Sequence, residues 1–171
     1  MKTLQNRAGY TLTEMMVVVG MLGILAGIGA PMLMGVSNFF LMTSARSETT
    51  RDSRAALSEI NRFLRQARSS TIVIDSAANQ GPYSRITFTL LDGRVMSFSQ
   101  TGNQLMQTVT PVSGAAASVM LTKNLAYIAF TYPRTDDVSI ISVAITMGKS
   151  IGLGRVNVLE LTVQDVRIMN S

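Results

Sequence analysis

The side chains that most often perform catalysis are scarce in this sequence. Its 171 residues include no histidine and no cysteine. This composition excludes a Ser-His-Asp triad, a cysteine nucleophile, disulfide bonds and the common zinc sites. A hydrolytic enzyme would need a Ser-Lys dyad or paired carboxylates instead. The composition therefore argues against an enzyme before any motif is considered.

The groups that remain for chemistry do not form a recognisable site. Lys149 and Ser150 are neighbours in the chain, and adjacent residues seldom form a catalytic pair. A calcium ion needs about six to eight converging oxygens, whereas the aspartates are scattered: Asp75, Asp92, Asp136, Asp137 and Asp165. We therefore expect no catalytic residue, no metal and no cofactor.

A long apolar run near the N-terminus dominates the sequence. No charged residue occurs from Met15 to Ala45, and Glu14 stands directly before this run. A helix of about 20 apolar residues crosses a bilayer, so the run is long enough to span one. A carboxylate at the start of such a helix is costly without a partner. The element that positions Glu14 is therefore predicted to be a membrane-spanning helix.

The net charge of +5 does not indicate a nucleic-acid-binding protein. Such proteins usually have a basic face interleaved with aromatic side chains, and this chain has no tryptophan and only 6% aromatic residues. Lys2 and Arg7 precede the apolar run, and a cluster of arginines follows it: Arg46, Arg51, Arg54, Arg62, Arg65 and Arg68. We expect nucleic acid not to be a partner.

Three interpretations of the apolar run are open. A secretory signal peptide has a short apolar stretch before its cleavage site, but here Pro31 follows the small Ala30 and the run continues. A plain transmembrane anchor fits the length but explains Glu14 only if its carboxylate lies at the level of the lipid headgroups. The third interpretation rests on the residues around Glu14.

The segment from Gly9 to Glu14, with the sequence GYTLTE, lies between a short basic leader and the apolar run. It resembles the class III signal of type IV pilin-like proteins. In that family a prepilin peptidase cuts after the glycine, the new N-terminal residue is N-methylated, and the glutamate is a hallmark. The resemblance implies cleavage between Gly9 and Tyr10, methylation of Tyr10 and a role in assembly for Glu14. Pro31 lies where the family usually has a helix-kinking proline, whereas Tyr10 replaces the usual phenylalanine.

The charge of Glu14 suits the role that the resemblance implies. The terminal amine of a chain that starts at Tyr10 is positive, so a carboxylate one helical turn away can pair with it or with the amine of a neighbouring subunit. An unpaired glutamate in a bundle of apolar helices is costly. The glycines of the run allow close helix packing, and together with Pro31 they lower helix propensity. We therefore expect this helix to loosen near its middle in a bundle.

Beyond the run, the helix is expected to continue to residue 70. No proline or glycine occurs over 46–70, and one helical face is apolar: Leu57, Ile60, Leu64 and Ala67. The arginines lie on the other sides, either as the solvated face of a helix laid on a sheet or as contacts to acidic faces of neighbouring subunits. If this segment faces outward, its arginines run against the positive-inside rule.

After residue 70 the apolar period changes from that of a helix to that of strands, which predicts an antiparallel sheet with one face on a helix. Asp92-Gly93 and Thr101-Gly102-Asn103 predict hairpin turns. Residues 111–114 and the alanines after them predict a loop, and residues 148–154 predict a turn. The apolar phase slips near Val158–Leu159 and again near Val166, which predicts a bulge or kink in the last strand.

The predicted fold class is α+β, with a long N-terminal α-helix packed on a C-terminal antiparallel β-sheet domain. We expect four parts: a cleaved leader over 1–9, a hydrophobic transmembrane or filament-core helix over 10–42, an amphipathic helix continuation over 43–70 and the sheet domain over 71–171.

The resemblance implies a structural subunit of a type IV pilus-like or type II secretion pseudopilus filament. Residues 86–95 and the strands after them are similar to J-type minor pseudopilins and W-type minor pilins, so we expect a minor subunit. Its partners would be other pilin or pseudopilin subunits, prepilin peptidase, the inner-membrane assembly platform and membrane lipid. It would cross the inner membrane once and then enter an extracytoplasmic filament. The alternative is a membrane-anchored binding module of the envelope, for adhesion, DNA uptake or substrate contact.

Overall fold

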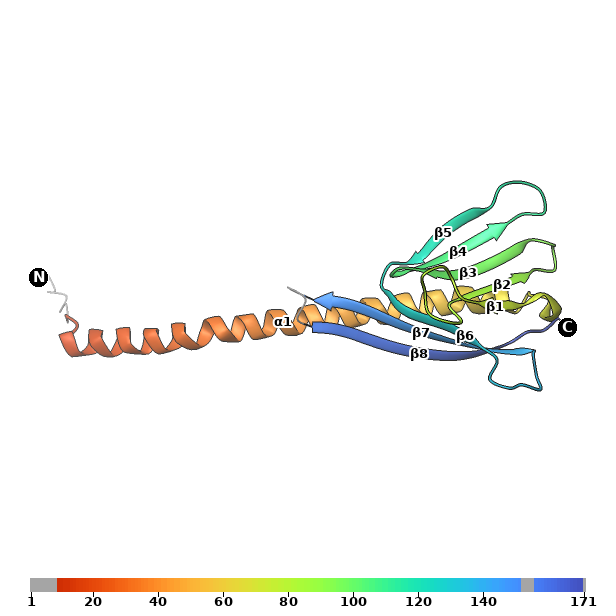
Figure 1. The fold of residues 1–171 in the computed structure, drawn as a ribbon. Coiled ribbons are helices and arrows are strands. Elements are labelled where there is room, and N and C mark those ends of the chain that lie inside the picture. Colours follow the sequence, from red (N-terminus) through yellow and green to blue (C-terminus); the bar gives the residue numbers. More distant parts are fainter. Residues whose placement is uncertain (1–8, 152–155, 171) are drawn as a thin grey trace, which may run out of the picture. The chain divides into compact units, whose positions relative to one another are not determined.

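The computed structural model describes residues 9–151 and 156–170, which form one long helix, a short 3₁₀ helix and eight strands (Figure 1). The chain divides into two compact units, Met1–Leu41 and Met42–Ser171. Helix α1 (Leu12–Leu64) contributes to both units. The predicted α+β class, with a long apolar N-terminal helix followed by antiparallel sheets, is confirmed.

In the first unit, α1 runs without interruption through Pro31. The large apolar side chains between Met15 and Met42 are exposed. The helix is long and apolar enough to cross a membrane. So many exposed apolar side chains need cover from lipid or from other helices. The loosening of this helix in a bundle stays a prediction.

The second unit contains two antiparallel sheets (Figure 1). The first has the strand order β1-β2-β3-β4-β5, and the second has the order β6-β7-β8. The strands are β1 (Val73–Asp75), β2 (Arg85–Thr89), β3 (Val95–Thr101), β4 (Gln104–Thr110), β5 (Ala117–Thr122), β6 (Leu125–Thr131), β7 (Ile140–Ile151) and β8 (Val156–Arg167). Each strand of a sheet is therefore linked to the next along the chain, which keeps the topology simple.

The two predicted hairpin turns are confirmed. Gly93 joins β2 to β3 with a φ of +88°, and Gly102 joins β3 to β4 with a φ of +58°. Such positive φ angles are easily adopted by glycine. The backbone N–H of Leu90 donates to the carbonyl of Arg94 at 2.8 Å and closes the first turn.

The predicted bulge in the last strand is wrong. β7 and β8 pair without a register shift along their whole length, from Ile140 opposite Arg167 to Ile151 opposite Val156. Irregularities occur instead between β4 and β5 and between β6 and β7.

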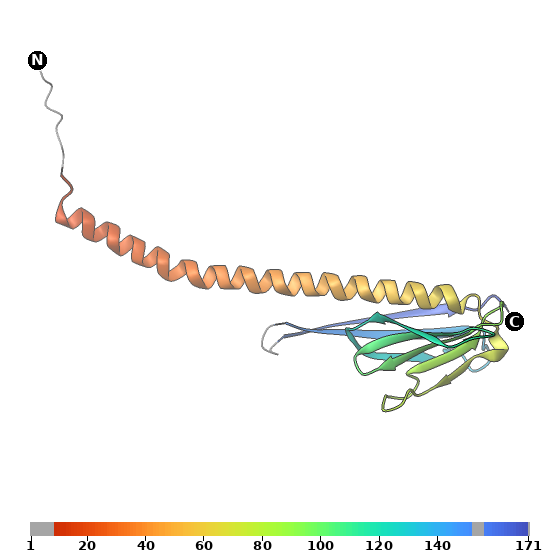
Figure 2. The ribbon, with the colours of Figure 1, turned by 90° about the horizontal axis from the view of Figure 1, so that it is seen from above.

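The apolar side chains near the middle of β8 explain why no bulge is needed. Leu159, Leu161 and Val163 are exposed, whereas Glu160 and Thr162 on the other face form hydrogen bonds to α1. The middle of the strand therefore keeps its register with polar residues toward the helix and apolar residues toward solvent, whereas Val166 near its end is buried in the core. Figure 2 shows this long hairpin alongside the C-terminal part of α1.

The turn predicted over 148–154 is wrong for its first four residues, because β7 continues to Ile151. Gly148 is a strand residue, and a Cβ atom there would lie 3.2 Å from Leu159 Cδ2. Its small size thus serves close packing between strands. Residues 152–154 lie outside the described residues.

The structure also differs from the prediction at three other places. The loop predicted over 111–114 and the alanines after it is confirmed except at Ala117, where β5 begins, and strand β5 itself was not predicted. The short strand β1 was not predicted. Helix α1 ends at Leu64 rather than at residue 70, because the chain then turns into the sheet. The N–H of Arg68 donates to the carbonyl of Thr89 at 3.0 Å, and a 3₁₀ helix follows over Ser69–Thr71.

The hydrophobic core lies between the C-terminal part of α1 and both sheets. The predicted apolar face of the helix is confirmed for Leu57, Ile60 and Leu64, which are buried. Ala67 is also buried, but it lies beyond the end of α1 and forms a β-bridge with Leu90. Phe98 of β3 packs against Phe88 and Phe63, with ring centroids 6.2 and 6.3 Å apart. The core residues of the second sheet include Phe130, Val143 and Ile145.

A polar stretch of α1 precedes this apolar face. Thr49 and Ser53 are buried although they are polar. The Thr49 hydroxyl donates to the carbonyl of Ala45 at 3.1 Å, and the Ser53 hydroxyl donates to the Thr162 hydroxyl at 3.0 Å. These hydrogen bonds satisfy the buried hydroxyls and align β8 with the helix.

The core predicts a large effect of Ile60→Ala. Ile60 has no exposed surface, so its truncation should lower the free energy of unfolding by about 2–5 kcal/mol. Denaturant unfolding of the full chain in mild detergent measures this loss. Val112→Ala is the control, because Val112 is 77% exposed and should change stability by less than about 0.5 kcal/mol. Equal effects of the two variants would contradict the described core.

Candidate processing and assembly site

The start of α1 is fixed by a reciprocal cap between Thr11 and Glu14. The Glu14 carboxylate accepts hydrogen bonds from the backbone N–H of Thr11 at 2.9 Å and from its hydroxyl at 3.1 Å. In return, the backbone N–H of Glu14 donates to the Thr11 hydroxyl at 3.3 Å. A threonine followed three positions later by a glutamate in this arrangement is a capping box. The cap explains why the helix begins at Leu12.

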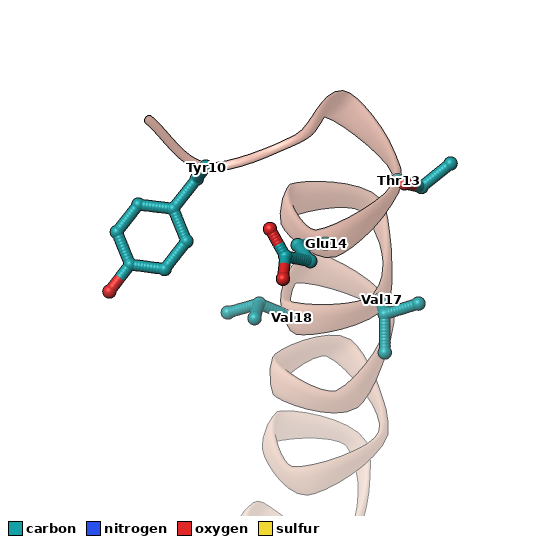
Figure 3. Close-up of a pocket in the computed structure, with 5 residues that line it drawn as sticks. All are labelled: Tyr10, Thr13, Glu14, Val17 and Val18. Carbon is teal, nitrogen blue, oxygen red and sulfur yellow. The ribbon is translucent and has the colours of Figure 1, made fainter. Parts of the chain in front are cut away.

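The residues on either side of the expected cleavage point precede the helix. Gly9 and Tyr10 are exposed, and the Tyr10 side chain is 84% exposed. Figure 3 shows the ring of Tyr10 on the same side of the helix as the Glu14 carboxylate, whereas Thr13 points to the other side. A shallow hollow between them is lined by Tyr10, Thr13, Glu14, Val17 and Val18.

The position of the Glu14 carboxylate suits a charge interaction with a chain terminus. Its hydrogen-bond donor, the N–H of Thr11, is one residue away from the nitrogen of Tyr10. If the chain began at Tyr10, that nitrogen would be a charged amine next to this donor. The partial positive charge of the helix N-terminus also favours a carboxylate there. The cap therefore holds the carboxylate close to the end that cleavage would create.

Pro31 is placed far along the chain from this group, inside α1. Its ring nitrogen carries no hydrogen and cannot donate to the carbonyl one turn earlier. The structure thus brings Tyr10 and Glu14 together but leaves Pro31 as a separate feature of the helix. Its role in assembly stays a prediction.

Lys149, considered for a Ser-Lys dyad, has a different partner. Its ammonium group forms an ion pair with Glu48 of α1. The hydrogen bond from Lys149, and then its charge, lower the pKa of Glu48 below its usual 4.5. The resulting stabilisation is present above pH 4.5 and is lost as the pH falls through the lowered pKa. Lys149 therefore helps to hold the β7–β8 hairpin on the helix.

The described residues also include no cluster of three or more acidic side chains placed to hold a metal ion.

Thr11 is the residue of this site that the sequence analysis missed. The signal was present, since a serine or threonine three positions before a glutamate at the start of an apolar run is the pattern of a capping box. The charge of Glu14 predicts its pairing with an amine, but its carboxylate also accepts a hydrogen bond from the Thr11 N–H at the helix N-terminus.

The cap predicts a local effect of Thr11→Ala. Loss of the hydroxyl removes the acceptor of the Glu14 N–H, so hydrogen exchange of that amide should accelerate roughly fivefold, the factor expected for the loss of a helix cap. Exchange measured by NMR on the full chain in detergent micelles tests this. Ser58→Ala, at an exposed position in the same helix, is the control. An unchanged exchange rate in Thr11→Ala would rule out the cap.

Comparison with known proteins identifies the same segment. Residues 4–30 match a family model described as the prokaryotic N-terminal methylation motif. No match was found among curated proteins. The match includes Gly9, Tyr10, the capping residues and the first half of the apolar run. This chain therefore carries the class III signal of type IV pilins and pseudopilins.

Proposed function

We propose that this chain is a structural subunit of a type IV pilus-like or type II secretion pseudopilus filament. The observation that carries the proposal is the combination of the methylation motif with a capped glutamate at the start of an apolar, exposed helix. The motif points to a structural protein rather than an enzyme. Within this class we assign it to the minor subunits, on the similarity of residues 86–95 and the following strands to minor pilins and pseudopilins.

Processing is the first step of the proposed function. Prepilin peptidase would remove residues 1–9 and expose Tyr10 as the N-methylated terminus. Gly9 suits a cleavage site, because it is exposed and a side chain at this position would meet no atom of the described residues within 4 Å. A glycine is therefore not required there by the fold, which leaves recognition by the peptidase as the reason for it.

Assembly is the second step. The helix over 10–42 would hold the processed subunit in the inner membrane until the assembly platform transfers it into a filament. There, helices of other pilin or pseudopilin subunits would replace lipid around the apolar side chains. The Glu14 carboxylate would pair with a terminal amine and select the register of the incoming subunit, and Pro31 would let the helix adapt to the bundle.

Gly9→Leu tests the processing step. We expect an uncut precursor in the membrane, because a peptidase that cuts after glycine has no room for a large side chain. The measurement is the mass of the chain after co-expression with prepilin peptidase. Gly20→Ala is the control and should be cut normally, because Gly20 lies inside α1 and is also free of contacts. Efficient cutting of Gly9→Leu would indicate another peptidase.

Two substitutions of Glu14 separate charge from capping in assembly. Glu14→Gln keeps an acceptor for the Thr11 N–H but removes the charge, whereas Glu14→Ala removes both. If pairing with an amine drives assembly, both variants should be processed normally but enter filaments at least tenfold less, a loss equivalent to about 1.4 kcal/mol. The measurement is the amount of each variant in sheared filaments relative to the membrane.

Thr11→Ala completes this comparison, because it removes the hydroxyl half of the cap and keeps the charge of Glu14. It should enter filaments nearly as well as the wild type. Normal incorporation of Glu14→Gln into filaments would contradict pairing between the Glu14 carboxylate and a terminal amine. A processed wild-type chain that never leaves the membrane would instead favour the envelope binding module.

A further inference from the structure

We propose that one face of α1, directly after the apolar run, binds the phosphate groups of anionic phospholipids. This arginine face consists of Thr43, Arg46, Ser47, Thr50, Arg51 and Arg54. The inference rests on the membrane-anchored state of the proposed function, but it does not depend on filament assembly.

The six residues form a single surface. They recur at intervals of three or four positions, which places them on one side of a helix, and they line a shallow groove. The three arginines are exposed. Thr49 and Ser53 lie on the buried side of the same turns, so the three arginines point away from the core, whereas Thr50 lies at the edge of the face and donates to Glu160 of β8.

The guanidinium groups of this face have no described protein partner, in contrast to those of the arginines farther along the chain. Among the described residues, no ion pair or side-chain hydrogen bond is formed by the guanidinium groups of Arg46, Arg51 or Arg54. The later arginines all have partners within the second unit: Arg62 pairs with Glu59 at 2.6 Å, Arg65 donates to Asn61 at 2.9 Å and Arg68 donates to the Leu91 carbonyl at 3.4 Å.

Three carboxylates lie near the arginine face, one of them at its edge beside Thr50, but the described residues include no ion pair between any of them and Arg46, Arg51 or Arg54. Glu48 forms its ion pair with Lys149. Glu160 accepts a hydrogen bond from the Thr50 hydroxyl, and Asp52 accepts one from the Asn124 amide at 3.5 Å. The positive charge of the arginine face is therefore available to an external anion.

The position of the face favours lipid over a protein partner. Arg46 is the first charged residue after the apolar run, only four residues beyond the exposed Met42. Arg54 lies about 12 Å farther along the helix axis, and helical side chains lean toward the N-terminus, which here is the direction of the membrane. Long arginine side chains can thus reach back to the headgroups.

The chemistry of the ligand follows from these groups. A guanidinium binds phosphate through two parallel hydrogen bonds, and the hydroxyls of Thr43 and Ser47 provide further donors on the same face. Basic residues on the outer side run against the positive-inside rule, and attraction to anionic headgroups offsets that disadvantage. Phosphatidylglycerol is a suitable probe of such a headgroup.

The test uses the full chain reconstituted in phosphatidylcholine bilayers. Electron paramagnetic resonance of spin-labelled lipids gives the association of phosphatidylglycerol relative to phosphatidylcholine at the protein surface. We expect the wild type to favour phosphatidylglycerol roughly fivefold. The triple variant Arg46→Gln, Arg51→Gln, Arg54→Gln should lose this preference, and high salt should weaken it in the wild type.

The matched control makes the same change of charge farther along the chain: Arg62→Gln, Arg65→Gln, Arg68→Gln. It should keep the preference. Equal loss in both triple variants, or no preference in the wild type, would overturn the inference. The inference would also be overturned if inorganic phosphate, added at constant ionic strength, abolished the preference for phosphatidylglycerol. The arginine face would then be a site for free phosphate.

Two further outcomes separate this inference from the proposed function. A chain that fails to enter the bilayer would contradict the anchored state and the inference together. A chain that enters the bilayer without lipid preference, and whose first triple variant is defective in filament assembly, would assign the arginine face to contacts between subunits. That result would overturn the lipid inference and leave the proposed function intact.

Discussion

The apolar side chains of α1 between Met15 and Met42 are exposed in the single chain and must be covered. A bilayer provides that cover for an isolated subunit, and the helices of neighbouring subunits provide it in a filament. The same constraint explains why charges are confined to the two ends of the segment, at Glu14 and from Arg46 onward. The second unit has its own core around Ile60, Phe98 and Phe130.

The strongest local patterns were enough to predict the main elements. Apolar side chains at helical spacing on the second half of α1 became the buried face that includes Ile60 and Leu64. Gly93 and Gly102 marked hairpin turns because their positive φ angles suit glycine. Gly9, Tyr10 and Glu14 could be predicted from a short motif without knowledge of packing. The family-model match over residues 4–30 includes that motif.

Patterns that depend on tertiary contacts could not be predicted. The apolar residues of β8 change phase along the strand, which indicates a bulge only if all of them are buried. In the structure Leu161 is exposed, and Thr162 accepts a hydrogen bond from Ser53 of α1. Strand β5 lies at the edge of its sheet, where Val119 is exposed and alternation is weak. The division of the strands into two sheets likewise has no local signal.

In the proposed function, the chain is cut after Gly9 and works through the new terminus. The most direct test is the intact mass and N-terminal peptide of the protein isolated from the envelope of its own host. The account predicts a chain that begins at a mono-methylated Tyr10. A chain that begins at Met1 would indicate a plain membrane anchor, and one that begins near Pro31 would indicate a secreted protein; either result would contradict the account.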